Sequence, residues 1–432
     1  MKSIIVGAGI GGLAAACGLL ALGWDVVIYE QASSFRPVGA GITLAPNAVR
    51  ALDWLGVGAA LQEQSAAHGA VGIRDASGRW LMRAPAEALE ERFGVPAFAL
   101  HRAALHEILA RGVPGSVIRT SHHVTAVVPG ERPVVRFEGP DGPGEDAADL
   151  VIGADGIDSA VRASLFPDHP GPAYAGYIAW RGIVAAGDAP AGSRDFGATE
   201  TWGRGERFGI VPLGDGQIYW FAVLGAPAGS HREDTLADLR ARFGHWHNPI
   251  PAVLAATRPE SLLLHDIRYL KEPLPRFHEG NVVLLGDAAH AMTPDLGQGG
   301  CQALEDAVTL VALLDEHNDA RAALAAYDRE RVPRTRKVVE ASARIGRVAQ
   351  LSNPVAASVR NALLRLVPAS AVLRASDETA GWTPPATPPR NERSCPRNRP
   401  TQAPRIGSSG TTASSSASSS ASWRSGSSPR RH

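Results

Sequence analysis

The sequence predicts an α/β fold with a Rossmann-like parallel sheet, an inserted and mainly antiparallel β-sheet lobe, and a C-terminal helical region. Three stretches carry this prediction. Residues 3–30 run strand, glycine-rich turn, helix and strand, which is the order of a βαβ unit. Residues 282–307 repeat the order strand, turn and helix. Residues 177–223 contain short strands joined by a Gly-Asp-Gly turn, as in an antiparallel sheet.

The composition is that of a globular protein with balanced charge. Of 432 residues, 44% are hydrophobic and 20% are charged, and 43 Lys and Arg offset 43 Asp and Glu. This balance gives no reason to expect a nucleic acid as a partner. Because the three cysteines are far apart, we expect neither disulfides nor a metal site, and a cytoplasmic location. No apolar run reaches the ~18 residues needed for a membrane span.

The first turn carries the glycine pattern of a dinucleotide site. Gly7 permits a tight turn, Gly9 lets the backbone approach a pyrophosphate, and Gly12 lets the helix pack against the strand. Glu30 ends the second strand and can accept hydrogen bonds from ribose hydroxyls. Since a carboxylate repels a 2′-phosphate, we predict FAD or NAD rather than NADP as the bound dinucleotide. The alternative is a glycine-rich turn in an unrelated apolar hairpin.

Residues 286–300, GDAAHAMTPDLGQGG, contain the second predicted nucleotide contact. The apolar run before them predicts a buried strand that ends just before Asp287. Gly297 to Gly300 precede residues rich in helix formers and therefore open a helix. Strand ends and helix starts hold phosphates and cofactors in open α/β folds. We interpret this stretch as the inner wall of a flavin site, in which His290 makes structural hydrogen bonds.

Two further stretches add candidate residues. Thr43 lies in a second glycine-rich crossing. Arg102 lies near the start of a predicted helix within residues 98–111, where it either reaches a phosphate or is a solvated surface side chain. Residues 149–162 indicate another strand, sharp turn and helix, with Asp155 in the turn.

The predicted antiparallel lobe, residues 174–224, is rich in aromatic side chains and carries Arg181 and Arg207. A sheet face lined by aromatic rings and a few arginines suits a flat, electron-rich or anionic ligand. Most of the aromatic side chains must still pack in the core of the lobe.

The C-terminal part divides into helices and a tail. Residues 321–347 predict a long helical region that Pro333 interrupts. Beyond residue 385 the chain is rich in Pro, Ser and Arg and cannot bury enough surface to offset its ordering entropy. We therefore expect residues 386–432 to be a disordered tail without function, the alternative being a tail that binds nucleic acid or membrane.

Taken together, three motifs resemble those of the single-component FAD-dependent aromatic hydroxylases, closest to the salicylate and urate hydroxylase branch. They are GAGIGG followed by Glu30, DLVIGADGIDSAVR, and GDAAHAMTPDLGQGG. The resemblance covers about residues 1–385 and implies the 4-hydroxybenzoate hydroxylase-like fold. We expect an FAD-binding domain formed by residues 1–172 and 276–385, with a substrate-binding lobe, residues 173–275, between them.

The resemblance also implies roles for single residues. Asp287 would bind a ribityl hydroxyl, and Pro294 would lie beside the reactive carbon of the flavin. Arg207, Tyr219 and Asp295 would surround the substrate. The complete set implied for the cofactor is Gly7, Gly9, Gly11, Gly12, Glu30, Gln31, Thr43, Arg102, Val124, Asp155, Gly156, Asp287, Gly297, Gln298, Gly299, Gly300 and Cys301.

The activity that the resemblance implies is that of an FAD-dependent monooxygenase, an oxidoreductase. NADH or NADPH would reduce the FAD, and O2 would form a flavin C4a-hydroperoxide that hydroxylates a small aromatic or heteroaromatic substrate. Two alternatives stay open: an epoxidase or polycyclic-antibiotic-modifying monooxygenase, and a flavin-binding protein without turnover. The chain would act as a monomer or homodimer.

Overall fold

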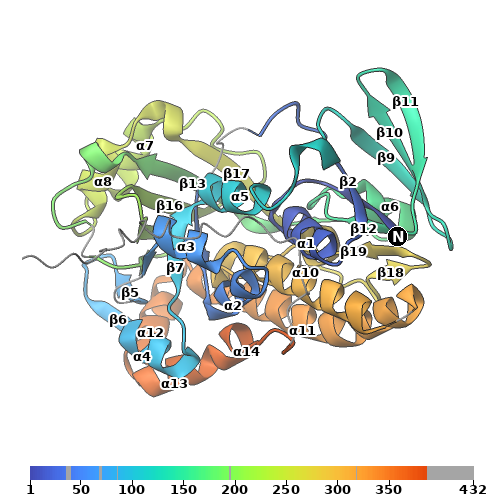
Figure 1. Ribbon diagram of the computed structural model, residues 1–432. Helices are drawn as coiled ribbons and strands as arrows, with labels where there is room; N and C mark the ends of the chain where they lie inside the picture. Colours follow the sequence, from blue (N-terminus) through green and yellow to red (C-terminus); the bar gives the residue numbers. More distant parts are fainter. Residues whose placement is uncertain (36–39, 68–70, 85, 194–195, 318, 387–432) are drawn as a thin grey trace, which may run out of the picture. The chain divides into compact units, whose positions relative to one another are not determined.

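The computed structural model describes residues 1–386, apart from residues 36–39, 68–70, 85, 194–195 and 318 (Figure 1). These residues belong to one compact unit, Met1–Arg393. The predicted tail, residues 386–432, lies outside the described residues except for its first residue. Within the described part, no helix is long and apolar enough to cross a bilayer. The same residues contain no group of three or more His, Cys, Asp and Glu side chains that could hold a metal ion.

A six-stranded sheet forms where the sequence predicted a parallel one (Figure 1). Its order is β18-β19-β12-β1-β2-β8, and every neighbouring pair is parallel except β18 with β19. The Rossmann-like fold is thereby confirmed. The strands are β1 (Lys2–Val6), β2 (Asp25–Tyr29), β8 (Ile118–Arg119), β12 (Leu150–Gly153), β18 (His278–Glu279) and β19 (Val282–Leu284).

The centre of this sheet brings three turns to one edge. β19, β12 and β1 are neighbours, are parallel and are almost entirely buried, as apolar runs in parallel sheets predict. The turns that follow them therefore lie side by side. Helices α1 (Ile10–Ala21) and α10 (Gly299–Glu316), which begin at two of these turns, pack against each other at Gly18, where a Cβ would lie 2.6 Å from Val311.

Two smaller sheets complete this part of the fold. One contains strands β9 and β10, which pair antiparallel, and a third strand, β11, whose sequence GPGEDA lacks apolar alternation. The other has the order β3-β7-β4. The stretch 98–111 begins as strand β7 and becomes helical at Arg102, because the His101 ring accepts a hydrogen bond from Ala103 N–H and caps the helix. The strands are β3 (Gly41–Leu44), β4 (Ala66–Ala67), β7 (Phe98–His101), β9 (His123–Val128), β10 (Val134–Gly139) and β11 (Gly142–Ala147).

The inserted sheet has seven strands in the order β17-β13-β16-β15-β14-β5-β6. All neighbouring pairs are antiparallel except β14 with β5, which confirms the prediction of a mainly antiparallel sheet. β5 and β6 come from residues 71–84, ahead of the predicted lobe, and the domain boundaries themselves stay a prediction. The strands are β5 (Val71–Asp75), β6 (Trp80–Ala84), β13 (Ala173–Val184), β14 (Thr199–Trp202), β15 (Glu206–Pro212), β16 (Ile218–Gly225) and β17 (Leu263–Tyr269).

The C-terminal region is helical, as predicted, but its long helix α11 runs unbroken from Ala320 to Ala349. The predicted interruption at Pro333 is therefore wrong. Pro333 lacks an N–H and so leaves the carbonyl of Arg329 unbonded, yet both residues are exposed, and water can solvate that carbonyl. The other helices are α2 (Pro46–Trp54), α3 (Gly58–Gln64), α4 (Ala86–Phe93), α5 (Arg102–Ala110), α6 (Ala160–Leu165), α7 (Leu236–Phe243), α8 (Ile250–Ala256), α9 (Asp287–His290), α12 (Pro354–Arg365), α13 (Ala369–Ala375) and α14 (Asp377–Ala380), with 3-10 turns η1 (Gly115–Val117), η2 (Ala186–Asp188), η3 (Pro259–Ser261) and η4 (Pro294–Leu296).

The two faces of the seven-stranded sheet have different surroundings. Trp180, Phe208 and Trp220 lie on the face that α7 and α8 cover and form one hydrophobic cluster with them. This confirms that several of the lobe's aromatic rings are core. The alternation along β13 and β16 places Arg181 and Phe221 on the opposite face.

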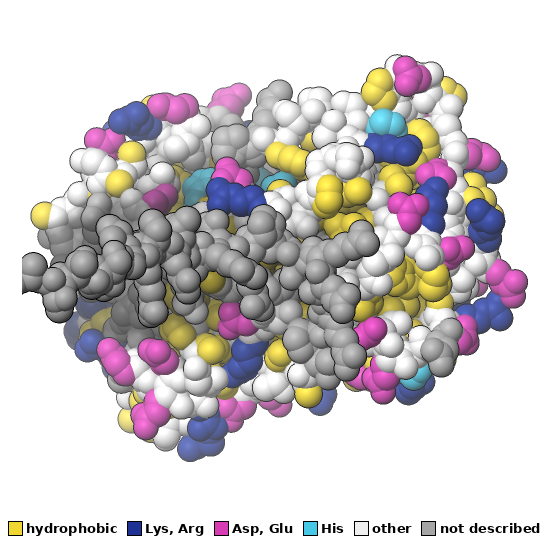
Figure 2. Space-filling model, in the orientation of Figure 1, with side chains coloured by type: hydrophobic (Ala, Val, Ile, Leu, Met, Phe, Trp, Pro, Cys, Tyr) yellow, Lys and Arg dark blue, Asp and Glu magenta, His cyan; other side chains and the backbone are white. Residues whose placement is uncertain are grey.

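The surface in Figure 2 carries acidic and basic side chains interspersed where the described residues are visible. This distribution agrees with the balanced composition.

Candidate flavin and substrate site

The turn between β1 and α1 has the backbone geometry that its glycines predict. Gly7 has a φ of +98°, which an L side chain rarely adopts. A Cβ on Gly12 would overlap the carbonyl oxygen of Gly7, and one on Gly11 would lie 2.6 Å from Leu285, so α1 packs closely only because both are glycine. Gly9 differs, because no heavy atom lies within 4 Å of where its Cβ would be. Its backbone faces open space of the kind a pyrophosphate needs.

Glu30 stands at the end of β2 and faces this turn. Its carboxylate accepts hydrogen bonds from Ala8 N–H at 2.8 Å and from Ala32 N–H at 2.9 Å. These two bonds hold the carboxylate beside the start of α1. Three other residues implied for the cofactor lie on separate elements. Arg102 is exposed at the start of α5, and Val124 is buried on β9. Gln31 follows β2, is exposed and contacts the His123 ring.

The turn after β12 lies against the turn after β1. A Cβ on Gly7 would lie 2.5 Å from the carbonyl oxygen of Ala154. The carboxylate of Asp155 accepts hydrogen bonds from Ser159 Oγ at 2.5 Å and from Val161 N–H at 3.1 Å, so it caps the start of α6. Burial raises the pKa of Asp155, against the effect of these bonds. Gly156 has a φ of +80° and open space at its Cβ position, as Gly9 has.

The third turn leads to the start of α10. Asp287 is exposed although the rest of α9 is buried, and its Oδ1 lies 4.0 Å from where a Cβ of Gly299 would be. The side chain of the N-cap residue Gln298 accepts from Gln302 Nε2 but from none of the first backbone N–H groups of α10, so these N–H groups remain available to a ligand. The Cys301 side chain is fully buried, and burial raises its pKa to about 12. Cys301 can therefore contribute its backbone but not a reactive thiolate.

Strand β3 connects this helix start to the seven-stranded sheet. Thr43 Oγ1 lies 3.2 Å from where a Cβ of Gly297 would be, and Ile42 lies 3.0 Å from the same position on Gly300. On the sheet side, a Cβ on Gly41 would lie 2.6 Å from the Tyr219 ring. The sequence-predicted residues Thr43, Gly297, Gly300 and Tyr219 are thus brought together by three consecutive residues of one strand, residues 41–43.

Arg207, Asp295, Tyr177 and Glu200 form a buried polar cluster, in which the Asp295 carboxylate comes from η4. Arg207 donates to Asp295 Oδ1 at 2.6 Å, and its Nη1 lies 3.1 Å from Glu200 Oε1. The Tyr177 hydroxyl donates to Asp295 Oδ2 at 2.7 Å. Burial, together with Asp295, raises the pKa of Tyr177 far above its usual range. Burial would lower the pKa of Arg207, but the charges of Glu200 and Asp295 outweigh it and raise that pKa.

This cluster differs from the substrate-facing arrangement expected from the sequence. The side chains of Arg207 and Asp295 are 3% and 0% exposed, and two carboxylates compensate the arginine charge. A Cβ on Gly346 of α11 would overlap the Asp295 carboxylate, so α11 closes the cluster. Pro294, in contrast, is exposed. Direct contact of Arg207 and Asp295 with substrate stays a prediction, while the geometry favours a role in holding Pro294 in place.

Arg181 is the second arginine that the sequence places in the aromatic-rich lobe, where the family resemblance gives it no role of its own. It pairs in register with Phe221, and Ile183 with Tyr219, on the sheet face opposite α7 and α8. Among the described residues, no carboxylate lies within ion-pair distance of Arg181. Burial raises the pKa of Tyr219, and the charge of Arg181 offsets part of that rise, so the two side chains are near each other. Alternation along β13, residues 177 to 183, is the signal that could have placed Arg181 on this face.

His290 takes part in a second buried network, which also includes the backbone of Gly286. Asp306 Oδ2 accepts from Gly286 N–H at 2.8 Å and lies 2.5 Å from His290 Nε2. Arg331 donates to Asp306 at 2.7 Å and to Glu305 at 2.5 Å. The network fixes the start of the GDAAH segment against α10 and α11, in keeping with a structural role for His290.

The comparisons with known proteins agree with this geometry. A family model described as an FAD binding domain matches residues 1–342. The chain is 38% identical over 389 residues to the aurachin C monooxygenase/isomerase of Stigmatella aurantiaca, covering 88% of this chain and 98% of that protein. It is 36% identical over 346 residues to the FAD-dependent urate hydroxylase of Klebsiella pneumoniae, covering 78% and 88%. The solved structure of Klebsiella pneumoniae HpxO complexed with FAD and uric acid superimposes with a TM-score of 0.81 at 31% identity, covering 88% and 96%.

The chain belongs to the FAD-dependent aromatic hydroxylase family. The hydroxylase is therefore an oxidoreductase that uses FAD, and the expectation of a flavoprotein monooxygenase is confirmed. Its residues fit FAD, because the open space at Gly9 and Gly156 lies at neighbouring turns, and the third turn leads to a helix start without a side-chain cap. The alternative of a flavin-binding protein without turnover finds no support among these relatives.

The cluster around Asp295 leads to a first prediction. We expect Tyr177→Phe to lower the free energy of unfolding by about 1.5–3 kcal/mol, because it leaves a buried carboxylate oxygen without its donor. Urea unfolding followed by circular dichroism measures the change. Tyr174→Phe is the matched control, since that hydroxyl donates to the carbonyl of Ala226 and the side chain is partly exposed. An equal loss in the two variants would contradict a special contribution of the bond to Asp295.

Proposed function

We propose that the hydroxylase uses NADH or NADPH and O2 to hydroxylate a planar heteroaromatic compound that carries an anionic or carbonyl oxygen. The observation that carries this proposal is the uncompensated charge of Arg181 beside Tyr219 and Phe221. A cation next to aromatic rings recognises a flat ring with a negatively polarised oxygen. Arg207 is less suited to this task because Glu200 and Asp295 already compensate its charge.

The position of this face relative to the flavin turns supports the proposal. Tyr219 contacts β3 at Gly41, and the next two residues of β3 contact Gly300 and Gly297. A ring bound on the sheet beside Tyr219 would therefore be near the start of α10. Gly209 on β15 contributes to the same site. Because it has no side chain, the Phe221 ring of the neighbouring strand lies over it and remains partly exposed.

Each group of residues has a distinct task in the proposed reaction. Bound FAD supplies the transfer of electrons from the nicotinamide and the activation of O2. The uncapped N–H groups of Gly299 and Gly300 would hold the pyrimidine edge of the flavin and favour negative charge there by about 0.3–1 kcal/mol. Arg181 would orient the substrate by its oxygen. The Arg207–Asp295 pair would hold η4, so that exposed Pro294 keeps its place beside the reactive carbon of the flavin.

A substrate screen with the purified, FAD-containing enzyme tests the proposal. Hydroxylated heteroaromatic acids and lactams, including uric acid, should accelerate oxidation of NADH or NADPH, consume O2 and yield a product with one more hydroxyl group. Oxidation of NAD(P)H without any hydroxylated product, or acceleration by uncharged hydrocarbons alone, would contradict the proposed substrate class.

Arg181→Met gives a second prediction. We expect KM for the anionic substrate to rise roughly 10–100-fold, because a charge-assisted hydrogen bond is worth about 1.5–3 kcal/mol. The ratio of bound FAD to protein should stay at the wild-type value, since Arg181 lies on β13 of the seven-stranded sheet and not in a flavin turn. Steady-state kinetics and flavin absorbance measure the two quantities. Arg268→Met, which removes an exposed pair with Asp158, serves as the control for loss of a surface arginine. An unchanged KM in Arg181→Met would remove the main support for the proposal.

A second candidate function is oxygenation of a larger ring system. The similarity to aurachin C monooxygenase/isomerase over nearly the whole of that protein favours it. The same screen separates the two, because acceleration limited to bulky polycyclic or substituted quinoline compounds would select this second candidate.

A further inference from the structure

Gln298, the N-cap residue of α10, carries a hydrogen-bond donor that no described residue uses. The residue is 3% exposed, and its Oε1 accepts from Asn47 Nδ2 at 3.0 Å and from Gln302 Nε2 at 3.1 Å. Gln298 Nε2 donates to no acceptor within the described part of the chain. Unlike Asn47 Oδ1, which the protein encloses without a partner, this nitrogen is not fully enclosed. Because buried polar groups are normally paired, Nε2 is expected to donate to a bound ligand.

Two arginines of α11 hold a buried carboxylate beside this amide. Arg331 donates to Glu305 Oε2 at 2.5 Å, and Arg334 donates to Oε2 at 2.6 Å and to Oε1 at 2.7 Å. Both oxygens of Glu305 are therefore acceptors, held in place by charge-assisted bonds.

This carboxylate determines which way the Gln298 amide points. Glu305 Oε1 accepts from Asn47 Nδ2 at 2.6 Å and from Gln302 Nε2 at 3.0 Å. Because the oxygen of Glu305 accepts, the atoms of Asn47 and Gln302 that contact it must be amide nitrogens. The same two nitrogens also contact Gln298, so the atom of Gln298 that faces them is its oxygen. The N–H group of Gln298 is thereby left for a partner outside this network.

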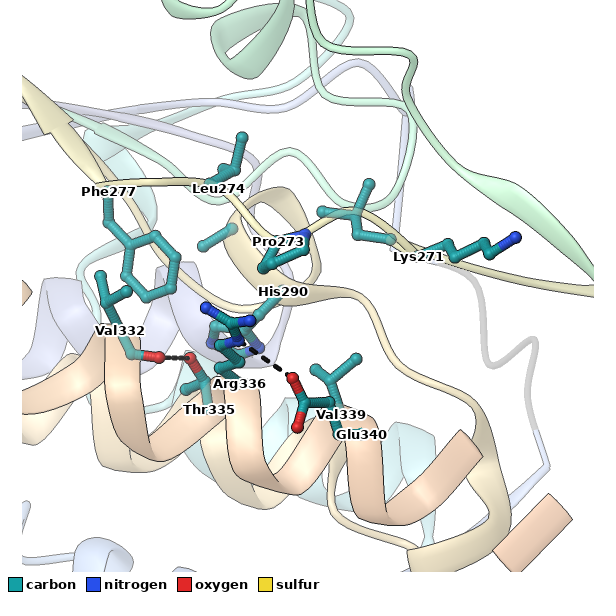
Figure 3. A pocket seen from close by; sticks show the side chains of 12 residues that line it. Lys271, Pro273, Leu274, Phe277, His290, Val332, Thr335, Arg336, Val339 and Glu340 are labelled. Carbon is teal, nitrogen blue, oxygen red and sulfur yellow. Dashed lines mark hydrogen bonds and ion pairs between the residues drawn. The ribbon is translucent and has the colours of Figure 1, made fainter. Parts of the chain in front are cut away.

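The opposite end of the network has no room for a cofactor ring. Arg331 also donates to Asp306, which lies 2.5 Å from His290 Nε2. Figure 3 shows the pocket beside His290, which Phe277 and residues of α11 also line, and its volume is about 40 Å³. That volume holds water but not an aromatic ring. The end at Gln298 is therefore the one that can meet a bound cofactor.

We propose that Asn47, Gln302 and Glu305 are positioning residues, which fix Gln298 so that its Nε2–H donates to an oxygen of the flavin ring. The segment that carries Asn47 also lines this helix start, since Thr43 lies beside Gly297. The proposal rests on the proposed place of the flavin at the start of α10 and not on the proposed substrate.

A double-mutant cycle on the full-length, FAD-containing enzyme tests the proposal. Flavin fluorescence on dilution measures the dissociation constant of FAD without substrate, so the result is independent of the substrate screen. Gln298→Met removes the donor, and we expect FAD to bind roughly 3–10-fold more weakly, the value of one hydrogen bond. Asn47→Leu should weaken FAD binding by up to the same factor. The double variant should bind FAD no more weakly than Gln298→Met alone, because Asn47 acts through Gln298.

The midpoint potential of bound FAD separates this role from a purely structural one. A donor to a ring oxygen stabilises the reduced, more negative flavin, so the potential of Gln298→Met should be more negative than that of the wild type. Should Asn47→Leu fail to fold, Asn47→Ser takes its place in the cycle, because the shorter side chain also loses the bond to Gln298. An unchanged potential in Gln298→Met, or additive losses of FAD affinity in the cycle, would overturn the proposal.

Asn281→Leu is the matched control for loss of an asparagine that bridges two acceptors. Its Nδ2 donates to the carbonyls of Glu131 and Asp149, but Asn281 precedes β19, whereas the flavin turns follow the strands of that sheet. This variant should keep the wild-type dissociation constant and midpoint potential of FAD. A loss of FAD affinity equal to that of Asn47→Leu would overturn the special role of Asn47.

Discussion

Replacing Arg331 with Met should destabilise the hydroxylase more than any other single change of a charged side chain considered above. Arg331 is 1% exposed and bonds to Glu305 and Asp306 and to the side chain of Gln302 at 2.9 Å. Its removal takes a fully buried counter-charge from Asp306 and Glu305, which keep only His290 and the partly exposed Arg334, and costs about 3–5 kcal/mol. We expect this loss in the free energy of unfolding, measured by urea denaturation with circular dichroism, and a low yield of FAD-containing protein.

Arg336→Met on the same helix is the matched control. Arg336 pairs with Glu340 within one helix, and both side chains are more than half exposed, so its loss should cost no more than about 0.5 kcal/mol. Similar stability of the two variants would mean that burial does not increase the contribution of Arg331 to the free energy of unfolding.

The same network has a defined pH dependence. Asp306 has a lower pKa in the folded chain than an ordinary carboxyl group, because His290 and Arg331 outweigh the effect of burial. Its stabilising contribution is therefore fully present above about pH 4 and is lost as the pH falls below that value. We expect the stability difference between the wild type and Arg331→Met to narrow over this acidic range. A difference that stays constant with pH would contradict the assignment to Asp306.

The second large effect is expected at the first glycine turn, where substitution of Gly12 should impair folding and substitution of Gly9 should prevent FAD binding. Gly12→Ala places a Cβ against the carbonyl oxygen of Gly7, so the variant should fold poorly. A Cβ at Gly9 would meet no protein atom within 4 Å, and the backbone there is extended, with a φ of −72°. Gly9→Val uses this open space. It should fold normally but be colourless, because its side chain occupies the space that the FAD pyrophosphate needs.

Flavin content and thermal unfolding separate these two outcomes. The flavin-to-protein absorbance ratio after reconstitution with FAD should be near zero for Gly9→Val, while its melting temperature stays close to that of wild-type apoprotein. Gly115→Ala, at another position with no atom within 4 Å, should bind FAD as the wild type does. Normal FAD content in Gly9→Val would move the pyrophosphate away from this turn.

Much of the flavin site could be predicted from the sequence because its requirements are local. A positive φ at Gly7, an overlap avoided at Gly12 and a helix that starts without a side-chain cap are properties of a few consecutive residues. Patterns of neighbouring residues therefore predicted the fold class and the cofactor, and the family comparison confirms both predictions. The burial of β1, β12 and β19 follows from their apolar runs in the same way.

Which side chains are available to the substrate was decided by the tertiary structure. The sequence resemblance assigned substrate contact to Arg207 and not to Arg181. The fold pairs Arg207 with Asp295, 88 residues away, and leaves Arg181 without a carboxylate among the described residues. Tyr177 reaches Asp295 across 118 residues. Pro333 likewise stays inside α11 because the carbonyl it leaves unbonded faces solvent. Backbone conformation is determined by neighbours in the chain, whereas the compensation of a charge and its exposure to water depend on residues that only folding brings together.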